Sequence, residues 1–488
     1  MLKHRSKLLP LLIAFLFIQL CSIVTPAAAA EVKDLASCSA FARPAVERLV
    51  QEGILSGDQN GYFNPKSPVT RGQMITIIVR SLELNQDSVP AVPSFKDVPS
   101  NHWANQYVET ALEKGIAAGI SSDEFGVDAE CTREQMAAMF VRSFSILDPG
   151  FVSATLPSVD LTTYNDNQKV SSWAKNSIGF SLYSGLLYGT TSSTISPDAI
   201  ATREQAAVLV DRFLNRKDTI IADRQASALL EQASTKLQSA ASFASTSDVK
   251  CSYTLWSPWL DLLGNFDINI SSIDEIVWPN ALHSKIRMEA DGLTQDQIPD
   301  YEEESYLKDN VIYENSITGS TVGGWKQYAP LTTQEVQQVM NGIRESLSNM
   351  TETGLEAHRT GLCTVEDAVV NGGRGYKISY TGNINDLSTY LNGSMSGLLS
   401  QYSGAVNESI QEIMSSFTSA SYTQTFYVSA IDGRLYGINI TNHIDCKQIA
   451  NPEVMPIKSM DITLLSSSYK YDTVSITVPD EAKNSPTN

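Results

Sequence analysis

One sequence unit occurs three times in the N-terminal half of this 488-residue chain, and this repetition constrains the fold more than any other feature. Each copy centres on a turn bounded by two glycines, at residues 53–57, 115–119 and 185–189. A Thr-Arg pair follows each turn and an aromatic residue precedes it, at the same offsets in every copy. The arginines are Arg71, Arg133 and Arg203, and the aromatic residues are Phe41, Trp103 and Trp173. Because so short a unit cannot bury its own hydrophobic face, the three copies predict one domain in which neighbours complete each other's core.

Each copy has the pattern of two helices joined by a loop. In the second copy Ala104, Val108 and Ala111 recur at helical spacing, and Gly115 then interrupts the pattern as a helix C-cap does. The second helix of every copy opens with Thr-Arg-x-Gln. This is a capping box, in which the Thr hydroxyl accepts from the amide three residues later and the Gln side chain accepts from the Thr amide.

The capping box explains the Thr and the Gln but not the Arg. A helix N-terminus carries partial positive charge, so a cation in the first turn is unfavourable by several tenths of a kcal/mol. A structural interpretation packs the Arg stem on Trp103 or Trp173, or pairs its head with Asp97 or Glu134. A functional interpretation makes the Arg and the helix N-terminus an anion site, with the aromatic residue as a wall for a sugar ring.

The repeats resemble the S-layer homology (SLH) domain of bacterial surface proteins. The resemblance rests on Phe95-Lys96-Asp97-Val98 with His102-Trp103-Ala104, on the Gly-Ile-x-x-Gly turn, on Phe63-Asn64-Pro65, and on the Thr-Arg pairs. It implies an all-α spindle of three repeats with pseudo-threefold symmetry, whose grooves hold pyruvylated secondary cell-wall polysaccharide. The motif's arginine for the ketal carboxylate corresponds to Arg71, Arg133 and Arg203, and its opening aromatic residue corresponds to Trp103 and Trp173.

The copies depart from the SLH pattern in four ways. The first copy has Phe41 in place of Trp and Gly72 at the usual Ala position. The third has an insertion, residues 161–170, between Asp160 and Trp173. All three have Gln where the motif's Glu is usual. The groove of the second copy is therefore the first choice for a working site.

The first thirty residues are typical of a secretory signal. A positive start with Lys3, Arg5 and Lys7 precedes an apolar stretch at residues 8–24, and we expect cleavage after Ala30. Cleavage removes these three cations and takes the formal net charge from −19 to −22. Such an acidic chain is not expected to bind nucleic acid or an anionic membrane. No later stretch is long and apolar enough to span a bilayer.

The cysteine and histidine pattern predicts neither a disulfide framework nor a metal site. The five cysteines of the mature chain are Cys38, Cys131, Cys251, Cys363 and Cys446. We expect buried free thiols, with a Cys363–Cys446 bridge as the alternative. The five histidines show no His-x-x-x-His spacing and there is no Cys-x-x-Cys, so no metal or cofactor is predicted.

The C-terminal half changes from a helical to an alternating pattern. Phe266, Ile268 and Ile270 alternate with polar residues, and the dipeptide Asp432-Gly433 separates two alternating runs as a hairpin turn does. Helical patterns are expected at residues 223–245, 332–347 and 385–417. The prediction is an α+β domain over residues 222–488, in which a curved antiparallel sheet of eight to ten strands packs on helices. The repeats are assigned to residues 31–85, 93–148 and 156–217.

The second domain resembles the half-barrel of LolA-like lipoprotein carriers. The order of its elements, the segment 306–313 and the later Trp325-Lys326 carry this resemblance. In that family an apolar cavity between sheet and helices takes acyl chains, which would make a lipid or another apolar molecule the ligand here.

An enzyme interpretation finds little support in the sequence. The run Glu302, Glu303, Glu304 is more typical of a solvated edge than of a glycosidase pair, and no Gly-x-Ser-x-Gly or Cys-His signature is present. We therefore predict a secreted, non-catalytic protein at the cell wall or surface of a Gram-positive bacterium, anchored by its repeats. A subunit of an S-layer lattice and a wall-anchored enzyme with an unrecognised site are the alternatives.

Overall fold

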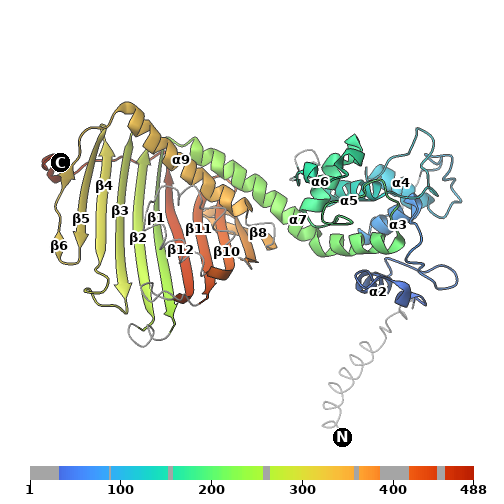
Figure 1. Cartoon of the computed structure of the whole chain (residues 1–488). Helices are drawn as coiled ribbons and strands as arrows, with labels where there is room; N and C mark the ends of the chain where they lie inside the picture. Colours follow the sequence, from blue (N-terminus) through green and yellow to red (C-terminus); the bar gives the residue numbers. More distant parts are fainter. Residues whose placement is uncertain are drawn as a thin grey trace, which may run out of the picture. The chain divides into compact units, whose positions relative to one another are not determined.

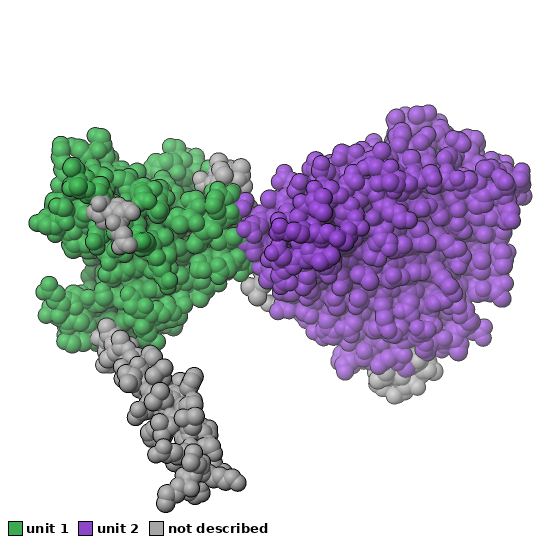
Figure 2. All heavy atoms as spheres, turned by 180° about the vertical axis from the view of Figure 1, so that it is seen from behind, with its two compact units in different colours: residues 1–221 green, residues 222–488 purple. Residues whose placement is uncertain are grey.

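The chain divides into two compact units, residues 1–221 and 222–488 (Figure 2). The computed structural model describes residues 32–86, 90–151, 156, 158–256, 264–356, 362–384, 417–447 and 457–487. The predicted secretory signal and the helical pattern predicted from Asn385 lie outside the described residues, except that Phe417 begins a strand.

Unit 1 contains three helix pairs, one for each repeat. They are α2 (Arg43–Gln51) with α3 (Arg71–Ser81), α4 (Asn105–Glu113) with α5 (Arg133–Leu147), and α6 (Lys175–Tyr183) with the first part of α7 (Arg203–Gln238). Short 3-10 turns precede the first helices, namely η1 (Leu35–Ser37), η3 (Leu161–Thr163), η4 (Asn167–Lys169) and η5 (Ser172–Ala174). The predicted capping box is present in all three repeats, at Thr70, Thr132 and Thr202. Gly53, Gly115 and Gly185 follow the first helices with φ of 72°, 69° and 69°, a conformation that favours glycine.

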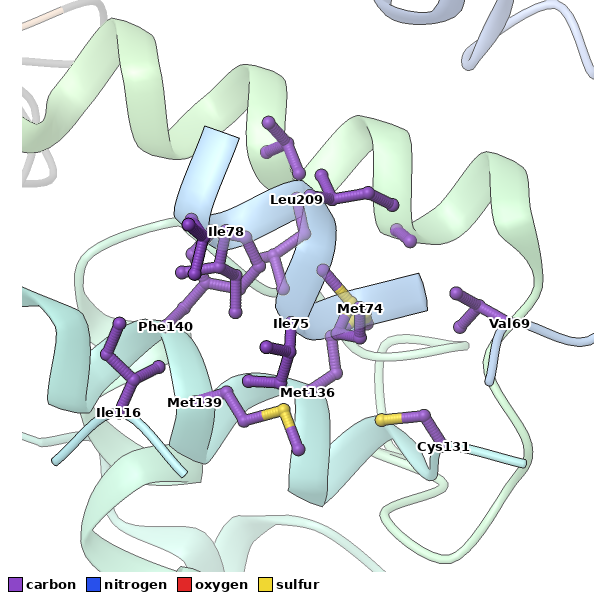
Figure 3. Packing of buried hydrophobic residues seen from close by; sticks show 14 of the residues in the cluster. Val69, Met74, Ile75, Ile78, Ile116, Cys131, Met136, Met139, Phe140 and Leu209 are labelled. Atoms are coloured by element: carbon purple, nitrogen blue, oxygen red, sulfur yellow. The ribbon is translucent and has the colours of Figure 1, made fainter. Parts of the chain in front are cut away.

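A ring of backbone hydrogen bonds joins the three repeats at their common centre. The amide of Val69 donates to Ala201 O, that of Ala201 to Cys131 O, and that of Cys131 to Val69 O, each at 2.9 Å. Each repeat therefore donates to one neighbour and accepts from the other. Val69, Cys131 and Ala201 are fully buried members of one hydrophobic core, which also contains Met74 and Phe140 (Figure 3). The three copies thus form a closed, pseudo-threefold arrangement.

An aspartate in each repeat fixes the loop that follows the glycine turn, and this corrects one sequence prediction. Asp97 accepts from the amides of Phe125 and Gly126 at 2.8 and 2.7 Å. In the third repeat Asp166, not Asp160, makes the equivalent contacts, with the amides of residues 195 and 196. Asp160 instead caps its own 3-10 turn through the amide of Thr162. The expected insertion at residues 161–170 is therefore wrong, because it was counted from the wrong aspartate.

Unit 2 is built on one curved antiparallel sheet, in which twelve strands are described (Figure 1). Their spatial order is β6-β5-β4-β3-β2-β1-β12-β11-β10-β9-β8, and β7 pairs with β5. Ten are long: β1 (Ser242–Leu255), β2 (Phe266–Val277), β3 (Ala281–Asp291), β4 (Tyr301–Lys308), β5 (Val311–Thr318), β8 (Leu362–Val370), β9 (Gly373–Ile384), β10 (Phe417–Ser429), β11 (Leu435–Cys446) and β12 (Ile457–Tyr471). The other two, β6 (Thr321–Val322) and β7 (Lys326–Gln327), have two residues each. The prediction of eight to ten strands was too low because so short a strand shows no alternation. The predicted hairpin at Asp432-Gly433 joins β10 to β11.

In the part of the chain that the structure describes, two helices pack on one face of this sheet. The last part of α7 and α9 (Thr333–Glu356) contribute Leu230, Leu237 and Met340 to a core that includes Ile378 and Phe426. Figure 1 shows α9 lying across the strands. A short helix, α12 (Asp480–Lys483), lies near the end of the described chain, and its Ala482 packs in a small cluster with Ala281, Tyr306 and Ile476.

Two further sequence predictions for unit 2 are wrong. The helix predicted over residues 223–245 ends at Gln238, and residues 242–245 begin β1, where Phe243 is buried. Glu302, Glu303 and Glu304 lie in β4 between β3 and β5, not at an edge of the sheet. There Glu304 accepts a 2.8 Å hydrogen bond from Tyr306 Oη and lies 3.0 Å from His283 Nε2.

The described cysteines are free thiols, four of them buried, and the alternative Cys363–Cys446 bridge is not formed. Burial raises the pKa of the Cys131 thiol to about 12. Among the helices that the structure describes, none combines the length and the hydrophobicity needed to cross a membrane.

Candidate binding grooves of the repeat unit

The three predicted arginines each reach from one repeat into the loop of the next. Arg71 donates through Nε to Phe125 O at 3.1 Å and through Nη2 to Ala118 O at 2.9 Å. In the same way Arg133 donates to Ile195 O at 3.2 Å and to Tyr188 O at 2.8 Å. Each guanidinium therefore joins the start of its helix to both ends of the neighbouring loop.

The third arginine closes this ring of contacts. Arg203 donates through Nε to Phe63 O at 2.7 Å and through Nη2 to Ser56 O at 3.2 Å, both in the first repeat. Its Nη1 donates to Gln73 Oε1 at 3.2 Å. Burial lowers the pKa of all three guanidinium groups, but an arginine keeps its charge in proteins. The arginines thus have a structural role, as one sequence interpretation expected. Their partners are backbone carbonyls of the neighbouring loop, however, and not the tryptophans or acidic residues that the sequence suggested.

The helix N-termini are not available to an anion, which corrects part of the functional interpretation. The amide of Arg71 donates to Ala129 O and that of Gly72 to Val127 O, both at 2.9 Å. The amide of Gln73 donates to the Thr70 hydroxyl of the capping box. Equivalent contacts occupy the amides at the start of α5 and α7. Any anion in these grooves must therefore be bound by side chains.

The acidic residues considered as partners of the arginines are engaged elsewhere. Asp97 holds the amides of its loop, as described above. Glu134 accepts from the amide and the hydroxyl of Ser171, at 3.0 and 2.7 Å, and so fixes the entry to the third repeat. Among the described residues, Arg71 and Arg133 form no ion pair with a carboxylate.

A groove with a volume of about 310 Å³ lies beside Arg71 and is built from all three repeats. The first repeat contributes Arg71, the second contributes the loop at residues 117–120 with Gln135 and Arg142 of α5, and the third contributes Trp173. The Trp173 side chain remains 51% exposed. Arg71 of the first repeat thus shares a groove with the aromatic residue of the third. Arg133, in the repeat chosen first from sequence, faces a different loop.

A second arginine in this groove was missed by the sequence reasoning. Arg142 lies nine residues after Arg133 on α5, and Arg80 and Arg212 occupy the same position after Arg71 and Arg203. Arg142 is close enough to Arg71, and Arg212 to Arg133, for the like charges to help lower the pKa of the buried partner. The sequence contains a signal for this arginine, because it recurs in all three copies. The signal is easily missed, because the arginine lies within a helical pattern that packing alone explains.

The charges around the three arginines differ. Arg212 lies over the ring of Tyr188, 4.2 Å from its centroid, beside Arg133. Arg80 instead donates from Nε and Nη2 to Tyr107 Oη at 3.2 and 3.1 Å. The carboxylates of Asp34 and Asp58 raise the pKa of Arg203 and partly offset its burial. Asp97 and Asp166 act in the same way on Arg71 and Arg133, but there a second arginine, Arg142 or Arg212, opposes them.

The remaining predicted aromatic residues are exposed to solvent. Trp103, at the start of the second repeat, is 54% exposed, and Phe41 in the first is 63% exposed. Among the residues that the structure describes, no group of three His, Cys, Asp or Glu side chains is placed to hold a metal ion.

Comparison with known proteins places the repeats in a described family. The family model of the S-layer homology domain matches residues 33–75, 94–137 and 163–207. The chain is 30% identical over 200 residues to the surface-layer 125 kDa protein of Lysinibacillus sphaericus, covering 40% of this chain and 16% of that protein. It is 27% identical over 201 residues to S-layer protein EA1 of Bacillus anthracis, covering 40% and 22%.

Other similarities are partial or low. An endoglucanase of Bacillus sp. is 31% identical over 171 residues, covering 35% of this chain and 17% of the enzyme, so the chain spans less than a quarter of each of these relatives. The crystal structure of LprF from Mycobacterium bovis aligns with 53% of this chain and 98% of that chain, at 10% identity and a TM-score of 0.27, which is too low to support an inference. The three matched segments are the repeats that the ring of backbone hydrogen bonds joins. The chain therefore carries three S-layer homology domains in its N-terminal unit.

Proposed function

We propose that the three SLH domains anchor this cell-surface protein non-covalently to secondary cell-wall polysaccharide, which we expect to be pyruvylated. Arg71, Arg133 and Arg203 would each meet a sugar carboxylate, and Trp103 and Trp173 would each face a sugar ring. The observation that carries the proposal is the groove beside Arg71, where an exposed indole and two guanidinium groups that pair with no described carboxylate line one cavity.

The chemistry of this groove suits an acidic sugar. Hydrogen bonds to the loop carbonyls use two of the five N–H groups of Arg71, which leaves donors for a ligand on the same planar group. A guanidinium binds a carboxylate through two parallel hydrogen bonds, and its charge shortens and strengthens them. Arg142 would add a second cation, and Trp173 an apolar surface for the C–H groups of the ring.

The test must separate binding from folding. Removing Arg71, Arg133 and Arg203 together would also break the contacts between repeats, so loss of binding by that variant would be ambiguous. The exposed side chains avoid this problem. We expect the triple variant Phe41→Ala, Trp103→Ala, Trp173→Ala to keep its thermal unfolding profile but to lose most of its sedimentation with purified cell walls. Ile431→Ala, at a residue of unit 2 that is 77% exposed, is the matched control.

Two results would overturn the anchoring proposal. One is full sedimentation of the folded triple variant. The other is unchanged sedimentation of the unaltered chain with walls from which the polysaccharide has been stripped.

For unit 2 we propose a non-catalytic binding role, with a lipid or another apolar molecule as the ligand. The supporting observation is a cavity of about 320 Å³ on the helix-covered face of the sheet. The relatives named as surface-layer proteins make a lattice subunit the second candidate. Regular sheets formed by the purified protein alone, seen by electron microscopy, would favour the lattice role.

A further inference from the structure

The cavity in unit 2 has an apolar wall and a polar wall. It lies between the covered face of the sheet and two helices, with Leu237 of α7 and Ile343 of α9 among its lining residues. Its apolar lining from the sheet consists of Phe243, Ile276, Leu282, Leu435 and Tyr469. A volume of about 320 Å³ is near the lower end for ligand pockets, so it suits one narrow chain better than a bulky ring system.

The polar wall centres on the Asp274 carboxylate. Ser284 Oγ donates to Asp274 Oδ1 at 2.8 Å from the neighbouring strand β3, and Ser272 Oγ donates to Oδ2 at 3.2 Å. Ser245 lies directly across from Asp274 on β1 and also lines the cavity. Further serines of the lining, Ser247 and Ser466, bond to each other at 3.1 Å. Among the described residues, no Lys, Arg or His lies within ion-pairing distance of Asp274.

This arrangement specifies the ligand's head group. A carboxylate only accepts hydrogen bonds, at about four lone-pair positions, and the two serine hydroxyls use part of that capacity. A group that donates, such as a hydroxyl or an ammonium, would complete its bonding. A second carboxylate would instead repel it, and the low dielectric of a cavity strengthens that repulsion.

We propose that unit 2 binds a single-chain amphiphile whose head group is a hydroxyl or an ammonium, and that Asp274 excludes fatty acids. The chain lies against Phe243, Ile276 and Leu282, and the head lies at Asp274. This inference rests on the apolar-ligand role proposed for unit 2 and narrows it to a class of head group.

The experiment compares probes that share one tail and differ in the head. Decylamine, decanol and decanoate are titrated into the full chain at pH 7, below their aggregation limits, by isothermal calorimetry. The amine and the alcohol are expected to bind at least tenfold more tightly than decanoate. In Asp274→Asn the amine should lose at least tenfold in affinity, and decanoate should gain. Asp248→Asn is the matched control, because Asp248 is exposed and lies in a groove on the opposite face of the same strands.

A further variant tests the cavity itself. Leu282→Phe fills it without changing its charge, so it should weaken all three probes by a similar factor. Equal binding of the three head groups, tightest binding of decanoate, or no effect of Asp274→Asn in a protein with an unchanged melting profile would overturn the head-group assignment alone. No saturable binding of any probe below about 100 μM would overturn the apolar-ligand role as well.

Discussion

At the scale of single residues, the arginines in unit 1 combine structural and binding roles in a way that can be separated by position. Arg71 and Arg133 are 6% exposed and donate to loop carbonyls of the next repeat, whereas Arg142 is exposed in the groove. The first arginine of each helix therefore holds the loop of the next repeat, whereas Arg142 on α5 lines the groove from an exposed position.

Arg133→Ala should lower the free energy of unfolding of unit 1 by about 1.5–3 kcal/mol, the range for hydrogen bonds made by a charged group. The substitution leaves the carbonyls of Tyr188 and Ile195 without their donor. Arg142→Ala should change stability by no more than about 0.5 kcal/mol, as exposed substitutions do, but should reduce wall binding. Urea denaturation and wall sedimentation of both variants check this pair, and equal stability losses would contradict it.

Gly72 marks the closest approach between repeats. A Cβ at this position would lie 2.6 Å from Val127 Cγ2 and 2.9 Å from Val127 O. Gly72→Ala should therefore destabilise unit 1 by about 1–3 kcal/mol, the usual cost of overpacking. Gly342→Ala, on an exposed position of α9 with no atom within 4 Å, should instead stabilise unit 2 by about 0.5–1 kcal/mol, because alanine favours a helix. Calorimetry of the two variants is the measurement, and shifts of the same sign would contradict the explanation.

The sequence allowed the arginines and the exposed tryptophans to be located, because they recur at fixed offsets. It did not allow the groove to be assembled. Arg71 and Trp173 share a cavity only because the repeats close into a ring, and no spacing within one copy contains that information. The glycine that replaces the usual alanine at position 72 is also explained by another copy, because a Cβ there would clash with Val127 of the second repeat.

At the scale of elements, unit 1 depends on aspartates that hold the loops. Burial alone would raise the pKa of Asp97 and Asp166, but hydrogen bonds from loop amides outweigh it and lower both pKa values. For a carboxyl whose pKa is lower in the folded state, the stabilisation is complete above its unfolded pKa, near 3.9, and is lost as the pH falls toward the folded value.

Unit 1 should therefore lose stability as the pH falls below about 4. At pH 7 the double variant Asp97→Asn, Asp166→Asn should unfold at a lower temperature than the unaltered chain. Between pH 4 and pH 3 its unfolding temperature should decrease less than that of the unaltered chain. Calorimetry at several pH values measures both, with the unit 1 transition identified by its shift in Gly72→Ala. A double variant with the same acid sensitivity as the unaltered chain would show that these carboxylates are not the cause.

Elements with a local chemical signature were predicted well. The three capping boxes and the Asp432-Gly433 hairpin formed where their residues require them. The errors lie where long-range packing decides. The sequence pattern did not reveal that α7 runs without a break from Arg203 to Gln238, because its first part packs in the core of unit 1 and its last part in that of unit 2. The start of β1 looked helical because its residues are small, yet pairing with β2 and β12 places it in the sheet.

At the scale of the whole molecule, the two units have separate hydrophobic cores. The core of unit 1 includes Phe140 and Phe213, that of unit 2 includes Ile378 and Phe426, and the two clusters share no residue. One core lies within the ring of three repeats, and the other lies between the single sheet and its helices. We therefore expect two cooperative unfolding transitions, of which only one governs attachment to the wall.

Ile378→Ala tests this expectation together with Gly72→Ala. Ile378 is fully buried, so its truncation should cost about 2–5 kcal/mol in unit 2 and leave the unit 1 transition in place. For units of this size 1 kcal/mol corresponds to roughly 2–4 °C, so the shifts are measurable by calorimetry of the full chain.

Because wall binding is assigned to unit 1, the Ile378→Ala variant should still sediment with walls at temperatures above the unfolding transition of unit 2. Gly72→Ala should release the wall at the temperature where unit 1 melts. A single transition shifted by both variants, or release of the wall when only unit 2 has unfolded, would mean that the units fold and bind as one.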